Sequence, residues 1–183
     1  IAEVMKSNGY RTYMCGKWHI AKSHNQKDGI ENWPVQRGFD KFYGTIRGFG
    51  SFYDPETLCR QNKFITPEND PEYKPDQFYY TEAITDNAIQ FLRDDADKKE
   101  PFFMYVAYTA AHWPLQAPEK DIAKYKGRFD SGYDALRKKR FENLKKLRLI
   151  NPKWEMKKKV RNWKENKNKK WEARCMETYA GMI

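Results

Sequence analysis

A helical pattern followed by a short apolar strand occurs twice in this sequence, and this repeated unit constrains the fold more than any other feature. Residues 79–95 place apolar side chains on one helical face, and residues 101–108 then form a continuous apolar run. Such a run predicts a strand buried on both faces, as in a parallel sheet. Residues 1–9 show the same helical spacing, and residues 10–15 predict another strand, which is the first along the chain. Two helix–strand units indicate an α/β fold.

Basic and titratable side chains follow both predicted strands. Gly16 is expected to end the first strand, and Lys17 and His19 come directly after it, two residues apart. Residues i and i+2 of an extended segment point the same way, so both are expected to face one pocket, while Trp18 points into packing. His112 follows the second strand, and ligands bind at the carboxyl ends of strands in open α/β sheets. A cation beside an imidazole suits an anionic group whose leaving oxygen needs a proton.

Each of these residues also has a purely structural interpretation. Lys17 and His19 could be a helix-capping cation and a core histidine, and His112 alone could be structural. Their common position at strand ends favours the pocket. Ser51, in the glycine-flexed loop 48–55, could supply a pocket hydroxyl or simply form a turn.

The remaining reactive side chains are expected to be structural. Cys15, Cys59 and Cys175 show neither metal-ligand nor Cys-x-x-Cys spacing, and Cys15 is expected to be buried in packing. His24 is expected at the surface. The acidic residues within 94–97 predict a solvated helix end, because no further oxygen ligands follow at calcium-loop spacing.

The rest of the chain divides by composition. Residues 21–78 are rich in Gly, Pro, Asn and Asp and are expected to form irregular loops around a pocket. A helix–strand unit carrying His112 is expected over residues 79–118. Residues 119–183 are expected to be helical, with a short helix at 119–126, a longer one at 133–149 whose inward face includes Leu147, and an exposed basic insertion at 151–171. No apolar run approaches the roughly 20 residues needed to span a bilayer.

The positive charge is concentrated in one segment. Residues 133–171 contain sixteen Lys or Arg and four acidic residues, a net +12, whereas the whole chain carries +10. Basic residues interleaved with Trp are typical of a polyanion-binding surface, for anionic polysaccharides or nucleic acid. No nucleic-acid-binding motif accompanies them, so a solvated basic surface is the first interpretation, polyanion contact the second, and nucleic acid is not favoured.

The residues around the strand ends resemble a sulfatase of the arylsulfatase type, in the alkaline-phosphatase-like superfamily. The resemblance covers residues 1–149 and resumes at 171–174. It implies an α/β sandwich with a mostly parallel central sheet flanked by helices, of which residues 1–183 would be a partial catalytic domain truncated at both ends, with a first unit at 1–20. The motifs that carry it are Gly16-Lys-Trp-His19, Trp33-Pro-Val-Gln-Arg-Gly-Phe-Asp40 and Ala111-His-Trp-Pro114.

The resemblance also implies roles for single residues. Lys17 is similar to the lysine that contacts the sulfate oxygens, and His19 to the histidine that steadies the hydroxyl of a formylglycine nucleophile. His112 is similar to the histidine near the ester oxygen, an acid for the leaving alcohol, and Ser51 would line the sulfate pocket. No Cys or Ser of this chain begins the Cys-x-Pro-x-Arg type of motif that is converted to formylglycine. The nucleophile and the ligands of the expected calcium ion are therefore expected outside the chain, and these 183 residues alone are expected to be inactive.

The implied activity is that of a sulfuric ester hydrolase. Aromatic loops and the basic surface favour a sulfated carbohydrate, with aryl sulfates remaining open. One alternative is a phosphonate or phosphodiester hydrolase of the same superfamily. The other is a non-catalytic polyanion-binding protein that uses residues 133–171. The family resemblance implies a periplasmic, secreted or lysosomal location, and the sequence itself gives none.

Overall fold

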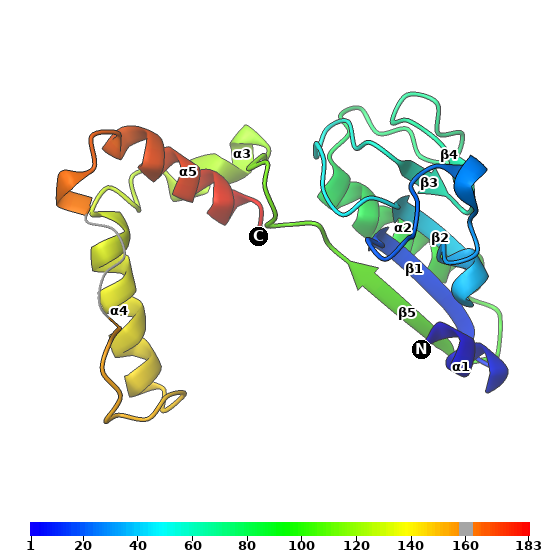
Figure 1. The fold of residues 1–183 in the computed structure, drawn as a ribbon, viewed down its shortest axis with the longest axis horizontal. Coiled ribbons are helices and arrows are strands. Elements are labelled where there is room, and N and C mark those ends of the chain that lie inside the picture. The colour runs from blue at the N-terminus through cyan, green and yellow to red at the C-terminus, as the bar shows by residue number, and fades with distance from the viewer. Residues whose placement is uncertain (158–162) are drawn as a thin grey trace. The chain divides into compact units, whose positions relative to one another are not determined.

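The computed structural model describes residues 1–157 and 163–183, and the chain divides into two compact units, residues 1–116 and 117–183. The first unit contains α1 (Ala2–Ser7), β1 (Arg11–Lys17), β2 (Lys41–Thr45), β3 (Leu58–Arg60), β4 (Lys63–Phe64), α2 (Tyr80–Asp94) and β5 (Phe102–Ala107), with short 3-10 turns at Gln26–Asp28 and Val35–Arg37 (Figure 1). The second contains α3 (Glu119–Ile122), α4 (Gly132–Lys146) and α5 (Lys169–Gly181), with 3-10 turns at Ala123–Tyr125 and Trp163–Glu165.

The first unit is built on a five-stranded sheet with the order β4-β3-β2-β1-β5 (Figure 1). β1 pairs in parallel with β2 on one side and with β5 on the other. β3 and β4 continue the sheet as antiparallel strands. Helix α2 packs on β1, β2 and β5. The predicted α/β fold is confirmed, with three parallel strands at the centre of a mixed sheet.

The expectation that residues 21–78 form only irregular loops was wrong. This stretch supplies β2, β3 and β4, so three of the five strands come from it. β3 and β4 contain three and two residues, too few to show an alternating pattern. Backbone pairing holds them in the sheet: β3 pairs with β2, which is separated from it by residues 46–57, and β4 pairs with β3 directly after a short turn.

The first predicted strand extends further than expected. β1 continues through Gly16 to Lys17, and Gly16 pairs with Gly44 of β2 and Ala107 of β5. Gly16 has a φ of 115°, and a Cβ atom there would overlap the Ala107 carbonyl. A Cβ atom on Gly44 would likewise overlap the Gly16 carbonyl. Glycine at both positions lets the three strands come together near their carboxyl ends.

The prediction that the second strand is buried on both faces was also wrong for the structure described. β5 lies at the edge of the sheet, where only β1 pairs with it among the described residues (Figure 1). Phe102 is 49% exposed and Tyr105 is 47% exposed. An apolar run shows that a strand carries apolar side chains. Burial of both its faces also requires other helices or strands to pack on each face of the sheet.

The second unit consists of helices, as expected. The short helix predicted near residues 119–126 is present as α3 and the turn that follows it. Leu147, which was expected to face inward, lies past the end of α4 and is 68% exposed. The basic insertion is not helical over residues 151–157, and α5 begins at Lys169. Residues 158–162 of this predicted insertion lie outside the described residues.

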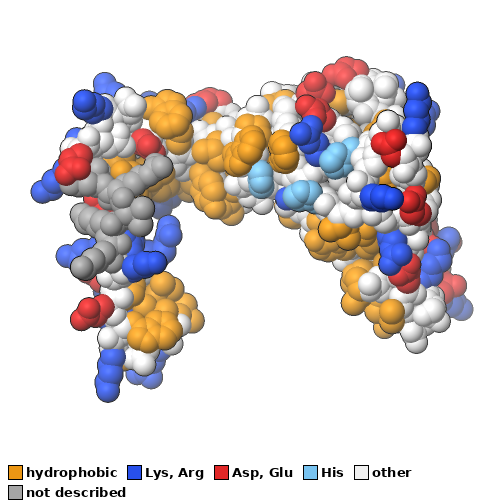
Figure 2. Space-filling model, in the orientation of Figure 1, with side chains coloured by type: hydrophobic (Ala, Val, Ile, Leu, Met, Phe, Trp, Pro, Cys, Tyr) orange, Lys and Arg blue, Asp and Glu red, His pale blue; other side chains and the backbone are white. Residues whose placement is uncertain are grey.

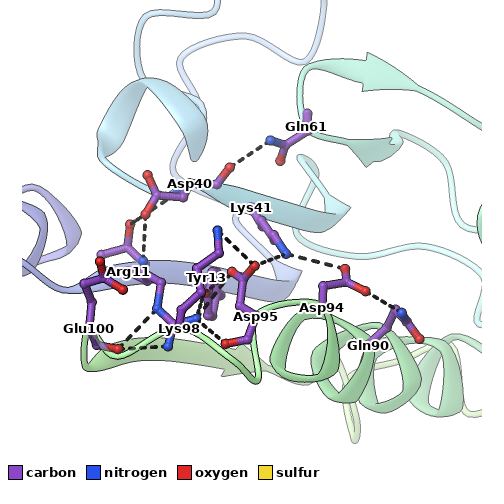
Figure 3. A network of polar contacts seen from close by, with 11 residues as sticks. Arg11, Tyr13, Asp40, Lys41, Gln61, Gln90, Asp94, Asp95, Lys98 and Glu100 are labelled. Atoms are coloured by element: carbon purple, nitrogen blue, oxygen red, sulfur yellow. Dashed lines mark hydrogen bonds and ion pairs between the residues drawn. The ribbon is translucent and has the colours of Figure 1, made fainter.

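The acidic cluster at the end of α2 is solvated only in part, because Asp94 and Asp97 are exposed and Asp95 is not. Asp95 is buried, and it accepts a hydrogen bond from the Tyr13 hydroxyl and lies 3.3 Å from the Lys41 ammonium (Figure 3). Arg11 donates a 2.9 Å hydrogen bond to the Asp95 backbone carbonyl. The hydrogen bond from Tyr13, together with the charges of Lys41 and Lys98, holds the pKa of Asp95 below its ordinary value. Asp95 therefore fastens the end of α2 to β1 and β2.

Replacing Asp95 by Asn is expected to lower the free energy of unfolding at pH 7 by roughly 1–3 kcal/mol, because charge-assisted contacts are lost. A carboxylate whose folded pKa is depressed stabilises the fold above its unfolded pKa of about 3.9, and this stabilisation disappears as the pH falls through the folded pKa. The difference between variant and parent is therefore expected to shrink below pH 4 in urea unfolding experiments. Asp97→Asn, an exposed neighbour, is the control. Equal stability of Asp95→Asn and parent at pH 7 would contradict this role.

Candidate active site

Lys17 is the last residue of β1 and lies opposite Thr45, the last residue of the parallel strand β2. Its side chain is half-buried. Across the described residues, no hydrogen bond or ion pair engages the Lys17 ammonium. A half-buried cation without an internal partner, at the carboxyl end of parallel strands, is available to an anionic ligand.

His19 does not continue the extended run on which its prediction depended. The strand ends at Lys17, and His19 has a left-handed backbone with a φ of 64°. Its backbone N–H donates a 3.1 Å hydrogen bond to the Ile46 carbonyl, which keeps it beside the segment after β2. The imidazole lies against Gly48, where a Cβ atom would overlap the ring. The side chain is exposed, so it is open to a ligand.

Trp18 packs inward, as expected. Its ring contacts Phe39 edge-on at 6.1 Å between centroids, and its Nε1–H donates a 2.8 Å hydrogen bond to the Asn32 carbonyl. The residue also packs on the core cluster that contains Met14 and Trp33. This anchor fixes the segment that carries Lys17 and His19.

His112 lies in the loop that follows β5. Its Nδ1 is 2.6 Å from the Trp113 backbone carbonyl. Because a carbonyl oxygen only accepts, Nδ1 carries a proton, and Nε2 has no partner among the described residues. The ring stacks on Phe49, with 6.1 Å between centroids and 12° between planes. This arrangement leaves Nε2 as the ligand-facing nitrogen.

The loop at residues 47–49 links the two histidines, and this was not foreseen from the sequence. Gly48 contacts the His19 ring, and Phe49 stacks on the His112 ring. Arg47 places its guanidinium 4.5 Å from the centre of the Phe49 ring and pairs with Glu56 at 2.6 Å. The structure therefore brings His19 and His112 against consecutive residues of one loop. Figure 2 shows histidine side chains (pale blue) exposed on the face drawn.

Ser51 behaves as a turn-forming serine. Its Oγ accepts 3.1 Å hydrogen bonds from the backbone N–H groups of Tyr53 and Asp54. It also lines a cavity of about 10 Å³ together with Thr109. A cavity of this size holds at most about one water molecule, so it is no sulfate pocket. A role for Ser51 in substrate binding stays a prediction.

The cysteine thiols are not poised for chemistry. Cys15 is fully buried, as expected from the sequence, and burial raises its pKa to about 12. Burial raises the pKa of Cys59 to about 12 as well and also raises that of Cys175. A thiolate is the nucleophilic form, so these thiols are inert near neutral pH. His24 is exposed, as expected.

No three His, Cys, Asp or Glu side chains come together as a metal site within residues 1–157 and 163–183. In the same described ranges, no helix is long and apolar enough to cross a membrane.

Comparisons with known proteins identify the family of this chain. A family model described as Sulfatase matches residues 1–183. The chain is 33% identical over 199 residues to an uncharacterized sulfatase of Schizosaccharomyces pombe, and 30% identical over 194 residues to an arylsulfatase of Klebsiella aerogenes. All of this chain aligns with each relative, but it spans only 34% and 40% of their lengths.

Two solved structures share the fold. Ps i-CgsB in complex with k-i-k-neocarrahexaose matches with a TM-score of 0.59 at 22% identity, over 99% of this chain and 32% of that one. A protein solved in complex with its substrate D-glucosamine-2-N,6-O-disulfate matches with a TM-score of 0.51 at 25% identity, over 70% of this chain and 22% of that one. By its matching family model and its relatives, this chain belongs to the sulfatase family.

Proposed function

We propose that the protein containing this chain hydrolyses sulfate esters at the site formed by Lys17, His19 and His112. The observation that carries the proposal is the unpartnered Lys17 ammonium at the carboxyl end of β1, close in sequence to a histidine that shares a loop contact with His112. A fixed cation and imidazoles at one sheet edge suit transfer of a charged sulfuryl group.

Each residue has a distinct part in this proposal. Lys17 binds the sulfate oxygens and stabilises the charge that they carry in the transition state. His112, with Nδ1 fixed on the Trp113 carbonyl, donates a proton from Nε2 to the leaving alcohol oxygen. His19 would hold the hydroxyl of the attacking group in position through a hydrogen bond.

Resemblance to the family implies two further groups in the complete enzyme, a formylglycine nucleophile and a calcium ion. The described residues bring no three His, Cys, Asp or Glu side chains together, so they lack the carboxylate cluster that calcium prefers. No Cys or Ser here begins the motif that is converted to formylglycine. We therefore assign both groups to residues outside this chain and derive no step through them.

Sulfated carbohydrate is the substrate class that the surroundings favour. The related protein at 25% identity was solved with a disulfated glucosamine. In this chain, Phe49 lies beside His112, and Trp113 is an exposed aromatic next to it. Aromatic faces beside His112 suit a sugar ring that carries a sulfate ester. Aryl sulfates are the second substrate class.

The test is the release of inorganic sulfate by the full-length protein, compared with hydrolysis of matched phosphodiester and phosphonate substrates. We expect sulfate release from 4-nitrophenyl sulfate and from sulfated oligosaccharides, and a Cys- or Ser-x-Pro-x-Arg motif encoded upstream of Ile1. A preference for the phosphodiester would support the rival hydrolase instead. Absence of all three activities would leave polyanion binding as the function.

A further inference from the structure

A hollow of about 680 Å³ lies at the carboxyl end of α4 in the second unit. Its lining includes the cationic residues Lys145 and Arg148 and the apolar residues Leu149 and Trp154. Its volume falls in the range of about 300–1,000 Å³ that is usual for ligand sites. We propose that this hollow binds a sulfated sugar unit of a polysaccharide, apart from the residues assigned to hydrolysis.

The end of α4 holds a cation where a helix end favours glycine. The Arg148 N–H donates to the Lys145 carbonyl and the Leu149 N–H donates to the Leu144 carbonyl, both at 3.0 Å. These two bonds define a helix stop in which the residue at the Arg148 position adopts a left-handed backbone, and glycine is usual there. Arg148 has a φ of 56°. A strained residue of this kind points to a functional requirement for its side chain.

The other wall of the hollow presents an exposed aromatic ring. Trp154 is 60% exposed and Leu149 is 67% exposed. The backbone N–H of Trp154 donates a 3.0 Å hydrogen bond to the Asn151 carbonyl. The backbone N–H of Lys153 donates a 2.9 Å hydrogen bond to the Asn151 side chain, so the turn that carries Trp154 is held by two bonds. An indole held at the surface offers an apolar face for the C–H face of a pyranose ring. In Figure 2, exposed hydrophobic side chains (orange) lie at this end of α4 with Lys and Arg side chains (blue) beside them.

The positive charge of the residues that line the hollow favours an anionic ligand. Of the described residues that line the hollow, Lys145 and Arg148 are cationic and none is acidic. A second hollow of about 720 Å³ is lined by Arg137, Arg140 and Lys157 but also by Asp134 and Glu172, so two acidic residues weaken its preference for an anion. A sulfate ester keeps its charge at every physiological pH and pairs well with Lys and Arg donors.

A sulfated polysaccharide is favoured over nucleic acid as the occupant. The hollow offers one aromatic platform, whereas single-stranded nucleic acid is bound on a succession of them. The choice of a sulfated sugar rests on the proposed function, while the hollow and its charge do not. Binding can therefore be measured without turnover, and failure of one proposal can be separated from failure of the other.

The experiment measures binding of a heparin oligosaccharide to the full-length protein by calorimetry, with an unsulfated hyaluronan oligosaccharide and a single-stranded DNA of equal length as comparison probes. Trp154→Ala and Arg148→Gly are each expected to weaken heparin binding about tenfold, the scale of losing one aromatic or charged contact. Arg148→Gly removes the cation while providing the residue that the helix stop prefers, so its thermal stability should equal or exceed that of the parent. Lys138→Gln, an exposed change on α4 away from the hollow, is expected to weaken binding less than twofold, as for a lone surface charge.

The outcomes separate the alternatives. Equal heparin affinity of Arg148→Gly, Trp154→Ala and Lys138→Gln would overturn the site. Tighter binding of DNA than of heparin, lost in the same two variants, would also overturn it in favour of a nucleic-acid surface. Loss of heparin binding in both variants while sulfate release from 4-nitrophenyl sulfate is unchanged supports this site. The same loss in a protein without sulfatase activity supports the site and removes only the proposed catalytic function.

Discussion

Lys17→Met in the full-length enzyme is expected to lower kcat/KM for a sulfate ester by about two to three orders of magnitude, as for loss of one strong electrostatic donor. The ammonium has no other partner among the described residues, so its loss should leave the fold intact and remove charge stabilisation of the transferring group. Sulfate release under single-turnover conditions is the measurement. Lys22→Met, an exposed change in the following loop, is the control.

His112→Gln should separate substrates by their leaving groups. A sugar alcohol is a poor leaving group and needs a proton, so its sulfate ester should react about a hundredfold more slowly in the variant. 4-Nitrophenolate leaves readily without a proton, and 4-nitrophenyl sulfate should therefore be hydrolysed at nearly the parental rate. His24→Gln is the matched control, because this exposed histidine is not part of the site. Equal losses on both substrates would show that His112 does not act as the acid for the leaving group.

The parts of the fold that could be predicted from sequence are those with local periodicity. Helix α2 and strand β5 come from a continuous pattern of apolar residues, and α1 and β1 repeat it at shorter length. Strands β3 and β4 could not be found in this way, because they contain only three and two residues and are held in the sheet by pairing, β3 with β2 and β4 with β3. Burial of β5 could not be derived from its composition either, because that depends on the layers around it.

In the candidate site, too, only the features that depend on local sequence could be predicted. The position of Lys17 and the inward packing of Trp18 follow from a strand that ends locally. The contacts of loop 47–49 with His19 and His112 depend on the left-handed backbone of His19 and on stacking between residues far apart in the chain. Asp95 was misinterpreted for a similar reason, since its partner Tyr13 is 82 residues away in sequence. Charge patterns do not reveal such distant partners.

A buried ion pair supports the strands next to the site. The Arg60 guanidinium donates hydrogen bonds to both carboxylate oxygens of Asp70, at 3.1 and 2.7 Å, and a third to Asn87 Oδ1 at 2.9 Å. It also lies 4.8 Å from the centre of the Tyr43 ring. Arg60 belongs to β3, which pairs with β2, so the contact connects the antiparallel strands to the strand that carries Gly44.

Asp70→Ala is expected to lower the free energy of unfolding by about 3–5 kcal/mol, because it leaves the Arg60 guanidinium buried without its carboxylate. Replacing both partners, as in Arg60→Met with Asp70→Leu, removes the unpaired charge and should recover most of this loss. Urea unfolding of Arg60→Met, Asp70→Leu and the double variant measures the coupling. Glu72→Gln, which removes only the exposed partner of Arg60, should change stability by less than about 1 kcal/mol. If Asp70→Ala were no more destabilising than Glu72→Gln, the buried pair would not hold β3 in place. If Asp70→Ala lowers the free energy of unfolding by the expected value of about 3–5 kcal/mol, the Arg60–Asp70 pair supports β3, and through it β2 and the site at the carboxyl end of β2, without being part of the site.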